Sequence, residues 1–271
     1  MGDIVLTAGV RSNLLQLQNT ADLMTQTQNR LATGKKVNSA LDNPINYFTA
    51  QSLTNRANSL SSLLDSMSNA TSTIQAANNG ITSITKLVQS AQALVSQAQQ
   101  TADTNTRATL ATQFNALLTQ IDELAGDAGF NGINLLSGDN LTVTLNENGT
   151  SSVTVNGVND TVAGDLSIGN ATNNWAAAGD LTAASTDLTA ALTTLQSQAQ
   201  SFGANLSTVQ IRQDFTKTMI NTLETGSDNL TLADTNEEGA NMLALQTRQQ
   251  LSTTALSLAA QAAQSVLRLF Q

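Results

Sequence analysis

Apolar residues recur at alternating intervals of three and four along a long internal segment of the chain. Such intervals place them on one side of a helix and are typical of a coiled coil with its a and d positions filled. The stripe has no missed step and consists of Leu60, Leu63, Met67, Ala70, Ile74, Ala77, Ile81, Ile84, Val88, Ala91, Val95 and Ala98. A single helix in water cannot bury such a stripe, so we expect the segment to pack against partner helices.

The same periodicity predicts one helix before this segment and another after it. We expect the first helix over roughly residues 5–32, ended by Gly34, a residue that tolerates a left-handed backbone. The long second helix should cover about 44–101, with Asn43 as its N-cap and a proline in its first turn. A third helix is expected over about 106–125.

The pattern changes after the third helix and becomes helical again towards the C-terminus. Apolar and polar residues alternate over 141–145 and 153–155, beside Asn- and Gly-rich stretches, which predicts one or two β-hairpins. Helical periodicity resumes at Leu181, and we expect Gly226 and the acidic stretch 234–238 to interrupt it before a last helical segment. The expected fold is therefore mostly α, a long antiparallel coiled-coil helical bundle from both chain ends with a small β-hairpin insert in the middle.

Weaker stripes of the same spacing occur near both ends of the chain. The N-terminal stripe consists of Val10, Leu14, Leu17, Ala21, Met24 and Leu31, with Gln28 at the missed step. The C-terminal stripe consists of Leu251, Ala255, Leu258, Ala262 and Leu269, with Leu243, Val266 and Phe270 nearby. Because their Ala, Ser and Gln content leaves little apolar area per residue, we expect both segments to be loose in a monomer and to fold on assembly. The core and subunit-interface candidates are Val10, Leu14, Leu17, Met24, Leu31, Leu251, Leu258, Leu269 and Phe270.

Composition narrows the chemistry that the chain can perform. None of the 271 residues is Cys or His, which removes disulfides, thiolate nucleophiles, His-based acid–base chemistry and the common zinc sites. Adjacent carboxylates at 122–123 and 237–238 point to different faces of a helix, so we expect no catalytic residue, no metal and no cofactor. The net charge of −9 argues against a nucleic-acid groove. Apolar runs are too short for a membrane span, and the N-terminus lacks the basic region and apolar run of a secretory signal peptide.

Three segments resemble bacterial flagellin, and their order is more specific than any one of them. Residues 30–42 are similar to the family's N-terminal motif RLSSGxRINSAxDD, and residues 130–136 to its FNGxxLL motif. Residues 234–270 are similar to its acidic turn, Gln/Ala-rich helix and terminal VLxLL. The motif positions that we single out are Arg30, Gly34, Asn38, Asp42, Phe130, Asn131 and Gly132.

The resemblance implies a structural subunit without enzymatic activity that polymerises into the helical tube of the flagellar filament, the propeller of swimming motility. It implies terminal inner-core helices over 1–38 plus 235–271, a helical bundle over 39–138 plus 177–234, and a β-hairpin insert over 139–176. This short insert would take the place of the large outer domains that many flagellins carry.

Partners and location follow from the same resemblance. The implied partners are many copies of the chain itself, the filament cap and hook-associated proteins, an export chaperone and the type III export apparatus, with no nucleic acid and no membrane span. The protein would be secreted and extracellular. The alternative is a hook–filament junction protein of the same superfamily, and a monomeric secreted helical binding module is a third class.

Several motif residues have a structural and a functional interpretation. Arg30 and Asp42 either brace the connector between the two helical layers or are two separately solvated charges, while Gly34 is expected to act as a hinge. The apolar residues around the second motif are expected to anchor the base of the hairpins by packing; they are Phe130, Ile133, Leu135 and Leu136.

Two stretches depart from the family pattern. Residues 41–48 replace the usual Ala- and Gly-rich stretch after the acidic pair. Residues 88–97 align with the helix segment LQRVRELAVQ, which an innate immune receptor reads in some flagellins, but Ser90 stands in place of an arginine and Ala93 in place of a glutamate. We therefore expect a poor ligand of that receptor. The hairpin region, about 141–162, is expected to tune filament shape.

Overall fold

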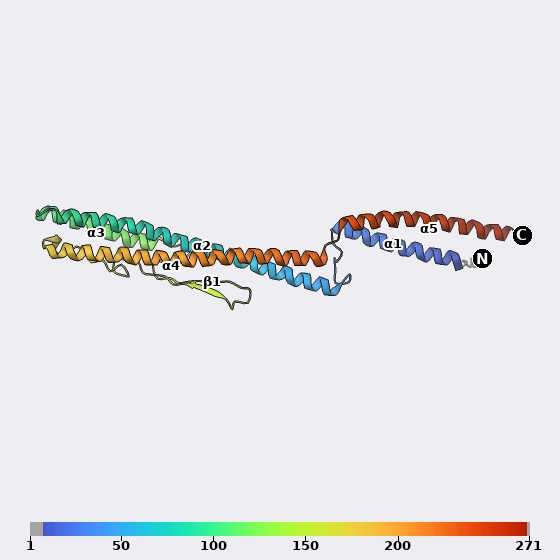
Figure 1. Ribbon diagram of the computed structural model, residues 1–271, viewed down its shortest axis with the longest axis horizontal. Coiled ribbons are helices and arrows are strands. Elements are labelled where there is room, and N and C mark those ends of the chain that lie inside the picture. Colours follow the sequence, from blue (N-terminus) through green and yellow to red (C-terminus); the bar gives the residue numbers. More distant parts are fainter. Residues whose placement is uncertain (1–7, 270–271) are drawn as a thin grey trace. The chain divides into compact units, whose positions relative to one another are not determined.

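The structure is a computed structural model that describes residues 8–269. Its order is α1 (Ala8–Thr33), α2 (Pro44–Gln99), α3 (Thr104–Asp127), β1 (Leu141–Thr144), β2 (Ser152–Val155), the 3₁₀ turn η1 (Asn173–Trp175), α4 (Ala178–Thr231) and α5 (Thr235–Leu269) (Figure 1). The expected fold class is confirmed, and the helix ends lie within a few residues of those that periodicity predicts.

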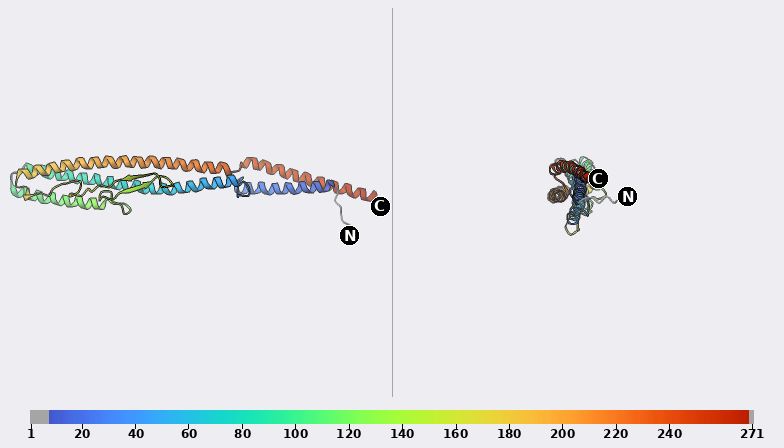
Figure 2. Two further views of the ribbon diagram at one scale, coloured as in Figure 1. Left: turned by 90° about the horizontal axis from the view of Figure 1, so that it is seen from below. Right: turned by 90° about the vertical axis from the view of Figure 1, so that its right-hand side faces the viewer.

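The chain divides into two compact units, each with its own packing. The terminal unit comprises Met1–Asn55 and Thr222–Gln271, and the central unit comprises Arg56–Asn221. In the terminal unit α1 lies beside α5, as both views of the ribbon show (Figure 2). In the central unit α2, α3 and α4 lie side by side and carry the hairpin.

The core of the central unit is built on the apolar stripe of α2. All members of the stripe are buried except Leu63, which is partly buried against the same core. The prediction that this stripe needs partner helices is therefore confirmed within the chain. The partners are apolar residues of α3 and α4, among them Leu110, Phe114, Leu118, Ile121, Leu188, Leu195, Phe202 and Val209.

An aromatic pair closes one part of this core. The ring centroids of Phe114 and Trp175 lie 5.0 Å apart, and both side chains are fully buried. Tilted pairs at this distance add to the apolar area that they bury. Trp175 is the single tryptophan of the chain, so its fluorescence reports on the packing of the central unit.

Gly80 lets the chain pass close to α2 in the central unit. A Cβ atom at this position would lie 2.6 Å from Leu136 Cδ1 and 2.8 Å from Ala128 Cβ. A glycine inside a helix costs about 1 kcal/mol relative to alanine in propensity. Here the cost is offset because the missing side chain makes room for Leu136, which is fully buried.

The β region of the described residues forms one antiparallel hairpin, where the sequence predicted one or two. Leu141 pairs with Val155, and Val143 pairs with Val153. Leu141, Val143 and Val155 are buried in the core, whereas the intervening threonines lie on the outer side. The alternation of apolar and polar residues thus places one face of the hairpin on the helices.

The expected interruption of the last long helix at Gly226 is wrong. Helix α4 continues through Gly226 to Thr231, and the chain breaks only at the acidic stretch that follows. A Cβ atom on Gly226 would lie 3.3 Å from Leu53 Cδ1, so this glycine serves close packing of α2 and α4 inside the terminal unit. Asp234 then begins α5, because its Oδ1 accepts hydrogen bonds from the N–H groups of Asn236 and Glu237.

Candidate subunit interface

The connector between α1 and α2 is held by the corresponding break between α4 and α5. Gly34 has a left-handed backbone with a φ of +68°, as expected for the residue that ends α1. The N–H groups of Lys36 and Val37 donate to the carbonyl oxygen of Thr231 at 2.7 and 3.2 Å, and Ala233 N–H donates to Gly34 O at 3.0 Å. The two chain breaks therefore pair with each other, and Gly34 as a hinge stays a prediction.

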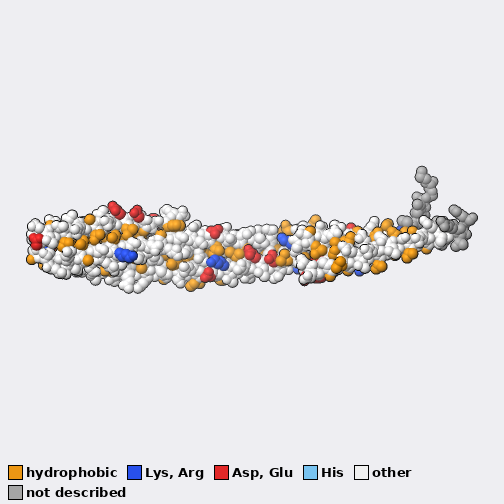
Figure 3. All heavy atoms as spheres, turned by 90° about the horizontal axis from the view of Figure 1, so that it is seen from above, with side chains coloured by type: hydrophobic (Ala, Val, Ile, Leu, Met, Phe, Trp, Pro, Cys, Tyr) orange, Lys and Arg blue, Asp and Glu red, His pale blue; other side chains and the backbone are white. Residues whose placement is uncertain are grey.

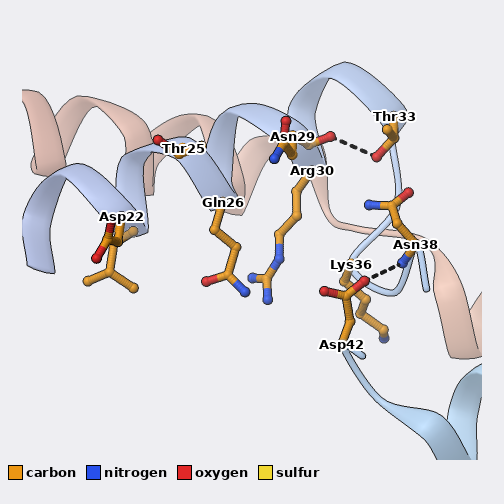
Figure 4. A pocket seen from close by; sticks show the side chains of 10 residues that line it. Asp22, Thr25, Gln26, Asn29, Arg30, Thr33, Lys36, Asn38 and Asp42 are labelled. Carbon is orange, nitrogen blue, oxygen red and sulfur yellow. Dashed lines mark hydrogen bonds between the residues drawn. The ribbon is translucent and has the colours of Figure 1, made fainter. Parts of the chain in front are cut away.

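Asp42 organises the second half of this connector. Its Oδ2 atom accepts a hydrogen bond from Asn38 N–H at 2.9 Å (Figure 4). The same atom accepts from Ser39 N–H at 2.9 Å and from the Ser39 hydroxyl at 3.3 Å. These donors favour the charged form and lower the pKa of the Asp42 carboxyl. Asn43 follows as the N-cap of α2, accepting from Asn46 N–H at 3.0 Å, which confirms the predicted cap.

Arg30 forms an ion pair with Glu238 and not with Asp42. Its Nη1 lies 2.8 Å from Glu238 Oε1, which joins α1 to the first turn of α5. Neither of the two interpretations of this pair is right: the backbone donors of the connector hold Asp42, and a buried carboxylate from α5 pairs with the guanidinium of Arg30. Arg30, Lys36, Asn38 and Asp42 all line a hollow on the surface of the terminal unit (Figure 4).

The face of α1 that packs against α5 is not quite the predicted one. At two of its positions the buried residue is the one that precedes the predicted residue in sequence. Thr20 and Thr27 are buried, whereas Leu14 is 38% exposed and Gln28 is exposed. The other predicted members of this face are partly buried; they are Ala21 and the set Val10, Leu17, Met24 and Leu31. Those four lie seven residues apart and set the true heptad, and threonines fill its alternate positions.

Helix α5 presents the predicted leucine stripe to the surface. Leu251 is 66% exposed and Leu258 is 61% exposed, so the chain itself does not bury them, and their place in a subunit interface stays a prediction. The residues half-buried on the opposite side are Met242, Leu245, Gln249, Ser252, Leu256 and Ala259. Leu269 lies in α5 with a side chain that is not described, and Phe270 lies outside the described residues.

Exposed leucines therefore gather on the terminal pair of helices. We call this set the terminal leucines: Leu14, Leu15, Leu23, Leu243, Leu251 and Leu258. Figure 3 shows apolar side chains spread over the surface of these helices. The paired faces of the two helices mix apolar residues with threonines and other polar residues, while six more leucines remain exposed on the outside, so this helix pair leaves much apolar surface in contact with water.

The second motif forms a tight turn that sequence reasoning did not foresee. Phe130 and Ile133 exchange two backbone hydrogen bonds, and the central residues Asn131 and Gly132 have φ values of 50° and 80°. Asn-Gly with both φ values positive is the signature of a type I′ turn, and this signal could have been read directly. Leu135 and Leu136 are buried as expected, but Phe130 is 39% exposed and does not anchor the hairpin.

Asn134, which the sequence motif did not single out, also has a structural role. Its Nδ2 donates to the carbonyl oxygens of Ala125 and Gly126, each at 2.8 Å, and so satisfies the end of α3. Its Oδ1 accepts from Leu136 N–H at 2.9 Å. The turn is thus a structural device that ends α3 and starts the segment leading to β1.

Neither a metal-binding cluster nor a membrane-spanning helix accompanies these features within residues 8–269. Among them, no group of three or more carboxylates stands close enough together to hold a metal ion. Over the same range, no helix is both long and apolar enough to cross a membrane. Ser90 and Ala93, the departures from the receptor-binding motif, are exposed on α2, while Val88 and Val95 point into the core.

Known proteins match this chain along nearly its whole length. The bacterial flagellin N-terminal helical region matches residues 7–141, and the bacterial flagellin C-terminal helical region matches residues 186–270. Flagellin FljK of Caulobacter vibrioides is 33% identical, with 100% of this chain and 99% of the relative covered. A flagellin of Brucella melitensis is 27% identical with complete coverage of both chains. A crystal structure of Bacillus cereus flagellin is similar with a TM-score of 0.48 and 20% identity, covering 55% of this chain and 86% of the other.

The two family matches and the full-length relatives define a structural filament protein with a helical region from each chain end. The chain belongs to the bacterial flagellin family, and it is a structural subunit of the flagellar filament, which serves motility.

Proposed function

We propose that this protein acts without catalysis, is secreted, and polymerises outside the cell through its terminal helices. The observation that carries the proposal is the set of terminal leucines on α1 and α5. Fully burying an exposed leucine side chain contributes roughly 1.5–3 kcal/mol. These six are between 38% and 67% exposed, so each can contribute part of that amount to association. In a flagellar filament, neighbouring copies of the chain would cover these leucines.

The interface candidates take different parts in this proposal. The half-buried residues Val10, Leu17, Met24 and Leu31 hold α1 to α5, while Leu14, Leu251 and Leu258 face the neighbouring subunits. Leu269 and Phe270 are included on the family resemblance alone, because the side chain of Leu269 and all of Phe270 lie outside the described part of the structure. Glu238, tied to Arg30, keeps the two helices in register as they are packed into the polymer.

Polymerisation can be tested with a matched pair of double variants on α5. Leu251→Ser with Leu258→Ser should abolish sedimentable filaments or raise the critical concentration at least about a hundredfold, since two buried leucines are lost. Gln246→Ala with Gln261→Ala changes two exposed polar positions of the same helix and should leave assembly unchanged. Normal filaments from the leucine variant, seen by electron microscopy, would contradict the proposal.

Assembly should also order the terminal unit. We expect proteases to cut the ends of the monomer and to leave the same ends intact in the polymer, because neighbouring copies cover them. A monomer that resists terminal proteolysis as well as the polymer does would favour a monomeric binding module instead.

The partners that the family implies complete the proposal. They are the filament cap and hook-associated proteins, an export chaperone and the type III export apparatus. Full-length similarity to curated flagellins supports the filament subunit over a hook–filament junction protein. Abundant long fibres in material sheared from the cells would separate the two, since a junction protein is present in few copies.

We further propose that the hairpin tunes filament shape. Gly149 has a φ of +68° in the turn, and a Cβ atom on Gly157 would lie 2.1 Å from the carbonyl oxygen of Asp139. Valine at either position must therefore displace the backbone of the hairpin. Gly149→Val and Gly157→Val should each alter filament curvature in light or electron micrographs, and an unchanged waveform in both would count against this role.

A further inference from the structure

After β2 the chain runs back along the helices of the central unit towards η1 (Figure 1). We call residues 158–168 the return segment. Val158 N–H donates to the carbonyl oxygen of Leu135 at 2.7 Å. Val162 N–H donates to Asp122 Oδ1 on α3 at 2.6 Å. The backbone of the return segment is therefore docked both on the stretch before β1 and on α3.

The return segment also contributes side chains to the core of the central unit. Val162, Leu166 and Ile168 are between 2% and 8% exposed, and all three belong to this core. Burial of these apolar side chains favours the docked position of the segment. Undocking would expose them to water together with the core surface that they cover.

A carboxyl group without a partner lies inside this docked segment. Asp160 is fully buried, and among residues 8–269 neither of its carboxyl oxygens has a hydrogen-bond partner. A carboxylate in such surroundings is costly, because burial disfavours the charged form. Burial accordingly raises the pKa of the Asp160 carboxyl to about 6.

Gln198 on α4 is the polar side chain that reaches Asp160. An amide can donate through Nε2 to a carboxylate, or accept through Oε1 from a carboxylic acid. The Oε1 atom of Gln198 is buried and has no donor within the described part of the chain. A proton on Asp160 is the donor that this pair lacks, and it would satisfy one atom on each side chain.

The charged side chains beside the return segment are all acidic. They are Asp165 in the segment itself, Asp122 on α3, Asp187 on α4 and Asp139 before β1. The charge of Asp165 adds to the raised pKa of the Asp160 carboxyl. No lysine or arginine of the described residues forms an ion pair with any of these side chains. A proton is therefore what neutralises Asp160 in the docked segment.

We propose that Asp160 is a proton-operated latch that holds the return segment on the helices of the central unit. When Asp160 is protonated, its O–H group donates to Gln198 Oε1 and the segment stays docked. When Asp160 is ionised, the segment undocks more often, because water then solvates the carboxylate. The latch operates within one chain and does not require polymerisation. Since the segment follows β2, its release also frees that end of the hairpin.

Linkage gives the sign and the size of the effect. The pKa of the Asp160 carboxyl is about 6 in the docked segment and near 3.8 when water surrounds the group. The stabilisation of the docked form is fully present below pH 3.8 and is lost as the pH rises through about 6. The equilibrium constant for undocking should rise by roughly a hundredfold over this range. Hydrogen exchange detects such openings even when the open form is a minor population.

Hydrogen exchange of the full-length monomer therefore tests the latch, read by mass spectrometry and corrected for the intrinsic effect of pH on exchange. Protection of the return segment should fall about tenfold between pH 5 and pH 8. At pH 8 it should also be at least about tenfold lower than protection of the buried α2 stripe, because the segment opens without unfolding of the unit. Unchanged protection of the segment between the two pH values would overturn the latch. Equal protection of the segment and the stripe would overturn it as well.

Two substitutions distinguish Asp160 from the other acidic side chains. Asp160→Asn cannot ionise and can still donate to Gln198, so protection of the return segment should become independent of pH. Asp127→Asn removes an exposed carboxyl group at the end of α3 and should keep the natural pH dependence. A pH dependence that survives in Asp160→Asn would show that another group controls the segment and would overturn the latch.

Asp165→Asn provides a second measurement that leaves the buried carboxyl in place. Asp165 Oδ2 accepts a hydrogen bond from Asn159 N–H at 2.9 Å, and the amide oxygen of an asparagine can accept the same bond. Because the charge of Asp165 adds to the raised pKa of Asp160, its removal should move the midpoint of undocking to lower pH. A midpoint that moves to higher pH would overturn the latch. The monomer is kept below the critical concentration throughout, so these results do not depend on filament formation.

Discussion

The central unit and the terminal unit use the same heptad spacing to opposite effect. In the central unit the a and d positions of α2 carry residues such as Met67, Ile74 and Ile84, and all are buried by α3, α4 and the hairpin. In the terminal unit the paired face of α1 buries Thr20 and Thr27, while leucines remain exposed on both helices. Spacing alone therefore makes a helix pair, but the apolar volume at those positions decides whether the pair is self-sufficient.

The difference matches the two tasks of a filament subunit. A unit with a complete core can fold before assembly, whereas a unit with external leucines gains its remaining apolar burial from neighbouring copies. The ion pair between Arg30 and Glu238 and the backbone pairing of the connector hold the terminal helices together until then. The difference between the two units leads to four expected results.

The largest expected effect comes from truncating the same kind of position in the two units. Ile84→Ala should lower the free energy of unfolding of the central unit by about 2–5 kcal/mol, because a fully buried side chain leaves a cavity. Leu251→Ala should change monomer stability by less than about 0.5 kcal/mol, since its side chain is exposed. Urea unfolding followed by Trp175 fluorescence and by circular dichroism measures both. Equal losses of unfolding free energy from the two substitutions would contradict the difference between the central and the terminal unit.

The second expected effect is a pH dependence of stability that arises from Asp160 in the central unit. Burial raises the pKa of the Asp160 carboxyl to about 6 and the nearby Asp165 adds to the shift, while the Gln198 side chain opposes it. The folded state thus holds this proton more tightly than the unfolded state, whose pKa is near 3.8. The resulting stability is fully present below pH 3.8 and is lost as the pH rises through about 6.

Asp160→Asn should remove this loss. At pH 8 the variant should be more stable than the natural chain by up to about 3 kcal/mol, and the two should converge at low pH. Urea unfolding followed by Trp175 at several pH values measures the difference, with the exposed Asp214→Asn as control. The carboxyl of Asp42 in the terminal unit has a lowered pKa, so its contribution has the opposite sign and is lost as the pH falls. A variant whose stability keeps the natural pH dependence would contradict the assignment to Asp160.

Alanine substitution at two glycines within helices of the central unit should change its stability by smaller amounts, and the two changes should have opposite signs. Gly80→Ala should destabilise by about 1–3 kcal/mol, because the new Cβ atom overlaps Leu136 and Ala128. Gly203→Ala meets no atom within 4 Å and should stabilise by about 0.5–1 kcal/mol through helix propensity. Thermal unfolding followed by Trp175 compares them. A stabilising alanine at position 80 would show that this core is not closely packed.

The smallest effect should stay within the terminal unit. Asn43→Ala removes the acceptor for Asn46 N–H and should destabilise the first turn of α2 by about 1 kcal/mol. Hydrogen exchange should therefore quicken at residues 44–48, while the unfolding transition of Trp175 remains in place. A shift of that transition would mean that the cap supports both units. Asn105→Ala, an exposed position in the first turn of α3, is the matched control outside the connector.

Much of the fold could be predicted because its determinants are local. The α2 stripe identifies its buried face whatever the partner is, since large apolar residues recur there and polar residues occupy the other sides. Asn43 and Gly34 define helix ends through their own side chain and backbone freedom. The family motifs add the order of the segments. Helix positions, the hairpin and the filament class followed from these signals.

The terminal helices show where such reasoning fails. Helix α5 has two weakly apolar faces, one with Leu251 and Leu258 and one with Leu245 and Leu256, so periodicity could not choose between them. The face that pairs with α1 is selected by fit to small residues such as Thr20, a property of two segments more than two hundred residues apart in sequence. The same holds for Arg30, whose partner Glu238 lies 208 residues away while Asp42 is close in sequence.

Most helix positions, the caps at Gly34 and Asn43, the strong α2 face and the kind of protein thus follow from local residue patterns alone. Tertiary structure decided which weak face is inside, which carboxylate meets Arg30, and why Gly80 must lack a side chain. The physical reason is that helix formation and strong amphipathicity act over a few neighbouring residues. Burial of a weak stripe, an ion pair or a glycine contact depends on what a distant segment brings to it.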